Sequence, residues 1–262
     1  MGGHWYTNEG KPMHWIEGAN GKQRDTTLRD ARKLNLFPSV TTILGTIDKP
    51  ALTKWKLKQV TGACYNASDT EAHSLYDDYH KAMMGEAFKP STDARDRGSE
   101  IHDCLEALIL DESRDAFDDD IKDIARVALL DVLRYCGAHR QDFTPEATVV
   151  GDGYGGMIDL HNDEFLIDWK TKDIDDIKKK MAYPEQAMQL AAYDHALEDW
   201  DGMPLSGRRC INVFIDRQEP GKLVIYEWKP EDISLAWQKF QLLVKYWQLD
   251  KGYVPNINEE EA

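Results

Sequence analysis

The sequence predicts an α/β domain in which a central sheet is flanked by helices and preceded by a helical N-terminal part. Apolar residues recur at helical spacing over residues 92–110, as in an amphipathic helix. Short apolar runs in residues 147–171 and 209–228 are bounded by turn residues, as strands are. One helical stretch separates these two strand regions and another closes the chain, which is the order of a compact α/β fold.

The individual elements follow from local signals along the chain. Residues 1–37 are polar, contain glycine and are expected to be irregular. Ser39 suits a helix start, Pro50 and Pro184 suit first helical turns, and Glu219-Pro220-Gly221 suits a hairpin turn. We expect a helical break at Lys89-Pro90-Ser91. The expected helices cover residues 39–47, 50–64, 67–84, 92–110, 116–139, 184–200 and 231–249, and the expected strands cover 147–151, 156–160, 164–171, 209–216 and 222–228.

The composition is that of a soluble globular protein. The chain has 262 residues, of which 42% are hydrophobic and 30% charged. No apolar run approaches the roughly 20 residues of a membrane span, and the first residues lack the hydrophobic core of a signal peptide. The four cysteines contain no Cys-x-x-Cys pair, which favours free thiols in a reducing compartment over a disulfide framework or a zinc ribbon. We therefore expect a cytoplasmic protein with no membrane partner.

The charge is strongly acidic but unevenly distributed. The formal net charge is −15, which predicts weak nonspecific affinity for duplex DNA. Residues 1–62 nevertheless carry ten Lys/Arg against five Asp/Glu. A basic surface on the N-terminal part, together with the positive charge of bound divalent ions, is compatible with a polyanionic partner.

The most informative segment is Gly155 to Lys170. A hairpin with Asp163 and Glu164 at its tip places Asp159 directly opposite Asp168, with Cβ atoms roughly 5 Å apart. Side chains alternate along a strand, so Lys170 shares the face of Asp168, while Ile158, Ile167 and Trp169 are expected to point the other way. Two carboxylates this close repel unless a cation lies between them, and one Mg²⁺ can bridge both.

The alternative for these residues is two acids and a lysine on a solvated hairpin. The acids lie inside apolar runs, Ile158-Asp159 and Phe165-Leu166-Ile167-Asp168, which should be mostly buried. A buried carboxylate needs a partner charge or a metal. The sequence alone therefore favours either an ion pair or a metal site.

Three further features are candidates for the same site, each with a structural alternative. His102 lies at the margin of a helical apolar stripe, where a lone histidine is ordinarily a satisfied core residue. Gln186, Gln189 and Tyr193 share one helix face, which ordinary packing also explains. The hydroxyls of Ser39 and Thr41, followed by a lysine-rich stretch, suit phosphate oxygens, although a plain helix cap is equally compatible.

Taken in order, these motifs resemble the RecB-type branch of the PD-(D/E)xK nuclease superfamily. The matching pieces are Arg97-Gly98-x-x-x-His102, Gly155-Gly156-x-Ile158-Asp159, Asp168-x-Lys170 and Gln189-x-x-x-Tyr193, with Pro38-Ser39-Val40-Thr41 extending the likeness towards the N-terminus. Each piece is weak alone, but their order and spacing together are specific. The chain is most similar to the phage-encoded and mitochondrial genome maintenance exonucleases of this branch.

The resemblance implies a restriction-endonuclease-like core, with a central mixed sheet flanked by helices, and a division into residues 1–90, a clamp for a DNA strand, and residues 91–262, the nuclease core. It implies Asp159, Asp168 and His102 as ligands of one or two Mg²⁺ or Mn²⁺ ions, with the Trp169 carbonyl completing the shell and Lys170 as the catalytic lysine. The implied substrate contacts are Gln189, Tyr193, Thr171, Lys172, Ser39, Thr41 and Arg97, and less securely Gln186, with Glu146 as a further acidic position. The family often has glutamate where Asp168 stands. Relatives with an iron–sulfur cluster use late cysteines, and this chain has none after Cys210, so we expect no cluster.

The expected function is metal-dependent hydrolysis of DNA from single-stranded ends. Hard cations on carboxylates activate water and neutralise the developing charge, while histidine tilts the preference towards Mn²⁺. Lys170 beside two acids is expected to stay cationic and to orient the water. The alternatives are an endonuclease acting on flaps or branches, and a catalytically silent acidic binding module or DNA mimic. Expected partners are single-stranded DNA and replication or recombination proteins, in a bacterial host cytoplasm if the chain is phage-encoded.

Overall fold

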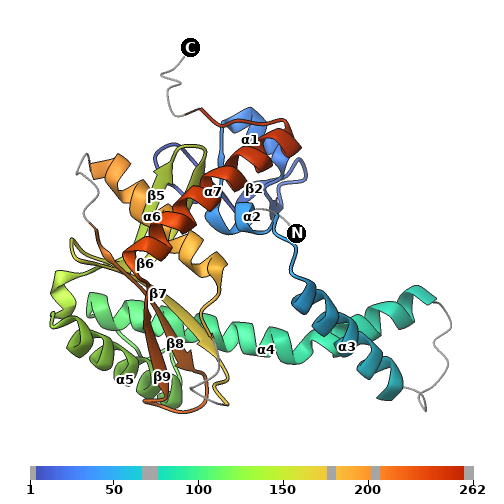
Figure 1. The fold of residues 1–262 in the computed structure, drawn as a ribbon. Helices are drawn as coiled ribbons and strands as arrows, with labels where there is room; N and C mark the ends of the chain where they lie inside the picture. The colour runs from blue at the N-terminus through green and yellow to red at the C-terminus, as the bar shows by residue number, and fades with distance from the viewer. Residues whose placement is uncertain (1–3, 67–75, 176–180, 202–206, 257–262) are drawn as a thin grey trace.

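A five-stranded mixed sheet forms the centre of the protein (Figure 1). The computed structural model describes residues 4–66, 76–175, 181–201 and 207–256. The strand order is β5-β6-β7-β8-β9, in which β7 and β8 are parallel and the other neighbours antiparallel. The strands are β5 Thr144–Gly151, β6 Tyr154–His161, β7 Phe165–Lys172, β8 Arg209–Asp216 and β9 Leu223–Glu227.

The hairpin of β6 and β7 has the register expected from the sequence. The Asn162 side chain shapes its turn by accepting hydrogen bonds from the backbone N–H groups of Glu164, at 2.9 Å, and Phe165, at 2.7 Å. Leu160 then pairs with Ile167, which is the alignment that a tip at Asp163 and Glu164 requires. The predicted register therefore holds next to the turn, but the ladder does not include the predicted pair of Asp159 and Asp168.

Beyond this pair the two strands separate. The ladder between β6 and β7 holds only two residue pairs, and Asp159 contacts β7 through its side chain rather than through its backbone. Ile158 consequently packs with the apolar cluster on the opposite side of the sheet from Ile167 and Trp169. The expectation that all three share one face is wrong, because β6 twists away from β7 to follow β5.

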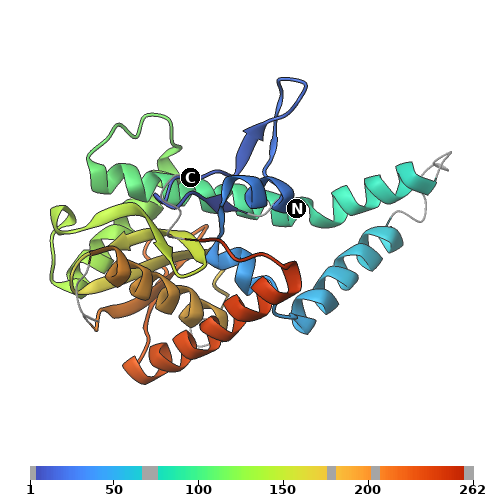
Figure 2. The same cartoon turned by 90° about the horizontal axis from the view of Figure 1, so that it is seen from above.

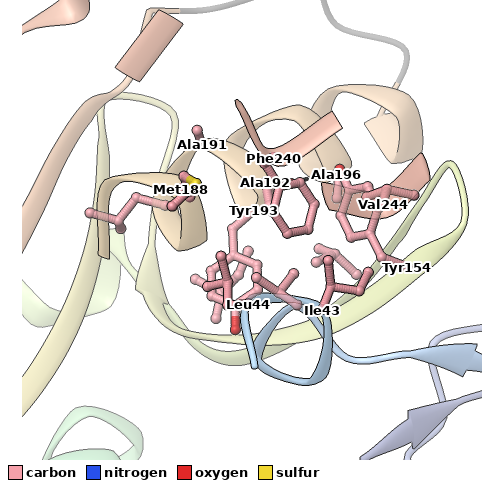
Figure 3. Packing of buried hydrophobic residues seen from close by; sticks show 14 of the residues in the cluster. Ile43, Leu44, Tyr154, Met188, Ala191, Ala192, Tyr193, Ala196, Phe240 and Val244 are labelled. Carbon is pink, nitrogen blue, oxygen red and sulfur yellow. Dashed lines mark hydrogen bonds between the residues drawn. The ribbon is translucent and has the colours of Figure 1, made fainter. Parts of the chain in front are cut away.

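Helices cover both faces of the sheet (Figures 1 and 2). Two of them, α4 Tyr76–Leu110 and α5 Asp119–Cys136, pack on one face through a cluster that includes Ile101, Ile124 and Trp169. On the other face lie α6 Pro184–Asp201 and α7 Pro230–Lys251, whose cluster is shown in Figure 3. Because β7 and β8 are parallel, the chain between them crosses the sheet, and α6 is part of that crossover.

The N-terminal residues are more ordered than expected. The elements are β1 Trp5–Tyr6, β2 Trp15–Glu17, β3 Gln23–Asp25, α1 Leu28–Leu34, β4 Phe37–Pro38 and α2 Val40–Leu44. Thr27 and Asp30 form a capping box at the start of α1, and the Trp5 indole donates to the Thr26 carbonyl at 3.1 Å. The expectation of irregular structure before residue 38 is wrong, because two- and three-residue strands show no periodicity in a sequence.

A helical arm projects from the core, formed by α3 Pro50–Asn66 and the first part of α4 (Figures 1 and 2). Ala63, Met83 and Ala87 form the small apolar cluster that joins the two helices. The expected break at Lys89-Pro90-Ser91 is wrong, since α4 continues through Pro90. All three residues are exposed, so water can satisfy the carbonyl that the proline leaves without a partner.

Two consequences follow for the expected organisation of the chain. The division at residue 90 falls inside a continuous helix, which carries the chain from the arm into the core. The expected helix over residues 67–84 lies partly outside the described residues, and its described part belongs to α4. Among the helices that the structure describes, none is both long and apolar enough to cross a membrane.

Candidate functional site

A cleft of about 800 Å³ opens between α4, the arm and the strands β5–β7. The expected site residues that line it come from four elements, α4, β5, β6 and β7, so the fold brings them together. They are His102, Glu146, Asp159, Trp169, Lys170 and Thr171. Trp55 of the arm also lines the cleft.

Asp159 and Asp168 are linked through the backbone of β7. The Trp169 N–H donates to Asp159 Oδ2 at 2.7 Å, so the Asp159 side chain spans the gap where the two strands separate. Asp168 lies one residue earlier on β7 and is buried, so it does not itself line the cleft. The Lys170 ammonium lies 2.7 Å from each of the Asp168 carboxylate oxygens and covers this acid from the cleft side.

Burial and mutual repulsion keep two carboxyl groups hard to ionise. Burial, reinforced by the charge of Asp168, raises the pKa of Asp159 to about 7. Burial also raises the pKa of Glu146 to about 7, with Asp159 and Glu106 adding to the effect. A bound cation would favour the ionised form of both acids and relieve this repulsion.

Lys170 is cationic, as expected from the sequence. Burial lowers its pKa, but the nearby charges of Asp168 and Asp159 outweigh this and raise the pKa above the usual value. A lysine in this state can stabilise negative charge on a phosphate, but it is a poor proton acceptor at neutral pH.

His102 reaches the cleft from α4. Burial lowers its pKa, against the opposing effect of Asp168, so the imidazole is neutral at pH 7 and has a nitrogen available as a ligand. One turn earlier, Gly98 permits the close approach of α4 to β7. A Cβ atom at Gly98 would lie 2.4 Å from Thr171 Oγ1. The glycine of the Arg97-Gly98-x-x-x-His102 motif thus lets the helix that carries His102 pack closely against β7.

Glu146 has an unusual backbone. Its φ of 49° lies in the left-handed region, which residues other than glycine rarely adopt. It stands between the pairs Pro145 with Leu160 and Ala147 with Ile158, directly across from Asp159. Such local strain is typical of positions that function fixes in place.

A second, smaller pocket of about 290 Å³ adjoins the cleft. Thr41, Gln186 and Gln189 line it, as does Lys49, whose ammonium lies 3.4 Å from the Glu185 carboxylate. Because Lys170 lines both this pocket and the main cleft, the two cavities meet at the lysine.

Four expected substrate contacts have other partners in the structure. The Ser39 hydroxyl accepts from the Thr42 N–H and caps α2. Tyr193 is buried against Gly156 and its hydroxyl accepts from Gln189 at 3.3 Å. The Arg97 guanidinium donates to the Arg217 carbonyl and to Asp120, both at 2.6 Å, and the Lys172 ammonium lies 4.8 Å from the centre of the Phe214 ring. None of these four side chains lines either cavity.

Sequence reasoning missed two groups of residues. Asp103 and Glu106 add acidic side chains to the cleft from the same helix as His102. Asn212 donates to Asp168 Oδ2 at 2.6 Å from the middle of β8. Its signal was present in the sequence, because a single amide interrupts the apolar run of residues 210–215.

The donor chemistry of the cleft suits a hard divalent cation. Carboxylate oxygens and a neutral imidazole are the ligands that Mg²⁺ and Mn²⁺ accept. As the side chains lie, no three His, Cys, Asp or Glu residues in the described part of the chain converge on one point. Lys170 holds Asp168 and the Trp169 N–H holds Asp159, so both acids already have protein partners. The residues that would hold a cation are Asp159, Asp168 and His102.

Comparisons with known proteins add little to this geometry. No family model matches the sequence, and no curated protein matches it. Several solved structures match, among them one described as "Crystal structure of SSO0001". It is 16% identical, covers 73% of this chain and 86% of that chain, and has a TM-score of 0.31. A likeness at this level carries no argument about function.

Proposed function

We propose that this protein is a divalent-metal-dependent deoxyribonuclease with a restriction-endonuclease-like core, acting as an exonuclease on single-stranded DNA ends. The observation that carries the proposal is the junction of β6 and β7. There the Asp159 carboxylate accepts from the Trp169 N–H, and the buried Asp168 pairs with Lys170. Asp159, Lys170 and His102 line the same cleft. This is the residue set that the resemblance to PD-(D/E)xK nucleases requires.

The roles of the chain's own residues follow from their charges. Asp159, Asp168 and His102 would hold Mg²⁺ or Mn²⁺, which when bound supplies positive charge to the phosphodiester and acidifies a water. Lys170 is cationic and would neutralise a phosphate oxygen and orient the attacking water. Glu146, with a pKa raised to about 7, can take up a proton near neutral pH.

The shape of the surrounding cavities supports a single strand as substrate. The cleft and the second pocket meet at Lys170. Lys49 lines the pocket just before α3 begins at Pro50, and Trp55 of α3 lines the cleft. The arm therefore borders a path, formed by the pocket and the cleft, that passes Lys170. An exposed indole on such a path can stack on any base, which suits single strands of any sequence.

The test compares two forms of one substrate. Purified protein is incubated with linear and with circular single-stranded DNA of the same sequence, in Mn²⁺ or in chelator. The proposal predicts degradation of the linear form only, in Mn²⁺ only, and loss of this activity in Asp168→Ala. Cutting of the circle would indicate an endonuclease, inertness of the wild type towards DNA in Mn²⁺ would favour a binding module, and an active Asp168→Ala would contradict the site.

A further inference from the structure

An amide lies in the middle of the central sheet, next to the proposed metal ligand. Asn212 has 0% of its surface exposed and sits between Ile211 and Val213 on β8. A buried amide is costly unless both of its ends are hydrogen-bonded. Both ends are: Nδ2 donates to Asp168 Oδ2 at 2.6 Å, and Oδ1 accepts from the Trp228 indole N–H at 2.7 Å.

The chemistry of these groups fixes the direction of the chain of hydrogen bonds. An indole N–H can only donate, so the Asn212 atom facing Trp228 must be the carbonyl oxygen. The other end is then the NH₂ group, which can only donate to Asp168. Trp228 therefore dictates the orientation of the amide, and the amide dictates which carboxylate oxygen it holds.

The two oxygens of Asp168 are consequently not equivalent. Oδ2 lies 2.7 Å from the Lys170 ammonium and also receives the Asn212 hydrogen bond. Oδ1 lies 2.7 Å from the same ammonium and has no second partner among the described residues. Since each carboxylate oxygen accepts about two hydrogen bonds or ligands, Oδ2 is saturated and Oδ1 retains one acceptor site.

We propose that Trp228 and Asn212 are positioning residues that occupy Asp168 Oδ2 and leave Oδ1 alone to bind a divalent cation. This inference rests on the proposed function. Ca²⁺ readily takes both oxygens of one carboxylate, whereas the smaller Mg²⁺ demands an octahedral shell and takes carboxylates through single oxygens. The pair thus favours a small octahedral cation over Ca²⁺ at this site.

The test measures metal binding rather than cleavage. The full-length, metal-free protein is titrated with Mn²⁺ and separately with Ca²⁺ by calorimetry, for the wild type, Trp228→Phe and Asn212→Leu. Trp228→Phe keeps an aromatic ring and removes only the donor, so it remains informative if Asn212→Leu fails to fold. The matched control is Trp5→Phe, which removes another indole hydrogen bond, to the Thr26 carbonyl, in the N-terminal part.

We expect Trp228→Phe and Asn212→Leu to bind Mn²⁺ about 10-fold more weakly, as removal of a group that orients a metal ligand typically does. Ca²⁺ affinity should fall less, so the preference for Mn²⁺ over Ca²⁺ shrinks, while Trp5→Phe leaves both affinities unchanged. Unchanged Mn²⁺ affinity in Trp228→Phe, or an equal loss of affinity in Trp5→Phe, would overturn the positioning role of Trp228 and Asn212. The nuclease proposal would still stand. A wild type that binds no Mn²⁺ would overturn both.

Discussion

Asp159 has a side-chain hydrogen bond that follows from the separation of β6 and β7, and a pKa that burial raises. It lies on β6 at the point where that strand leaves β7, so its carboxylate takes the Trp169 N–H that the ladder no longer uses. Its pKa of about 7 means that the metal-free protein holds this proton over a range in which the unfolded chain, with a usual value of 3.8, has lost it.

This difference predicts how the stability of the metal-free protein depends on pH. Because the folded state binds more protons between about pH 4 and pH 7, the free energy of unfolding falls as pH rises through that range. Asp159→Asn keeps an acceptor for the Trp169 N–H and removes the charge. In chelator at pH 8 we expect this variant to be about 2–4 kcal/mol more stable than the wild type, with less than half of this advantage at pH 5.

Denaturant titrations at the two pH values measure this effect. Asp163→Asn, at the exposed tip of the same hairpin, is the matched control and should change little. Added Mn²⁺ should stabilise the wild type more than Asp159→Asn. If the free energy of unfolding changed equally with pH in the wild type and in Asp159→Asn, Asp159 would not be the source of the pH dependence.

At this scale the sequence predicted the central charged residues of the site and missed Asp103, Glu106 and Asn212 around them. Asp159, Asp168 and Lys170 were found because charged residues interrupt apolar runs at strand spacing. Asn212 carries the same signal but shares no motif with them, since its partner Asp168 is 44 positions away in the chain. Arg97 looked like a substrate contact, yet it braces Asp120 and the end of β8, which only the tertiary structure reveals.

At the scale of elements, the contact between α4 and β7 sets the position of His102. Gly98→Ala would place a Cβ atom 2.4 Å from Thr171 Oγ1, so either the Thr171 side chain or the helix must shift. We expect a loss of about 1–3 kcal/mol in the free energy of unfolding, as overpacking typically causes, together with a reduction of the proposed nuclease activity. A Cβ atom at Gly85, on the same helix, would meet no other part of the described chain within 4 Å, so Gly85→Ala should be neutral or stabilise by up to about 1 kcal/mol.

Thermal unfolding of the two variants tests this contact. The double variant Gly98→Ala with Thr171→Ala removes the colliding oxygen and should recover most of the lost stability. If Gly98→Ala behaved like Gly85→Ala, the close approach would have no energetic consequence.

Most of the long elements were predictable, whereas the short N-terminal strands and the continuity of α4 through Pro90 were not. The strands of the sheet and helices α5, α6 and α7 match expectation to within a few residues, because each carries a sustained apolar pattern. Pro90 misled because the exposure that lets α4 tolerate it is a property of the folded arm. The β1–β4 pair joins residues 5–6 with 37–38, a contact between segments too short to show any period.

For the whole molecule, the arm carries a basic surface on an otherwise acidic chain. The net charge of −15 disfavours nonspecific DNA binding, while Lys54, Lys56 and Lys58 lie exposed on α3. Trp55 lies among them, lines the cleft and packs near Phe88, with ring centroids 6.2 Å apart. The arm is therefore where we expect a nucleic-acid strand to make its aromatic contact.

Trp55→Ala should therefore weaken binding of single-stranded DNA by about 10-fold or more, because one base–aromatic stack contributes about 1–3 kcal/mol. Fluorescence anisotropy in chelator, which prevents cleavage, measures the affinity. The matched control is Trp15→Ala, which removes an even more exposed indole from β2, away from the cleft. Equal losses in the two variants would argue against a strand path under the arm.

The central claim is that Asp159 and Asp168 share a divalent cation with His102 nearby. The most direct measurement is anomalous diffraction from crystals of the full-length protein soaked in Mn²⁺. The account predicts an anomalous peak in the cleft, bonded to a carboxylate oxygen of each aspartate and absent in Asp168→Asn. A cleft without a peak, or a peak that persists unchanged in Asp168→Asn, would contradict it.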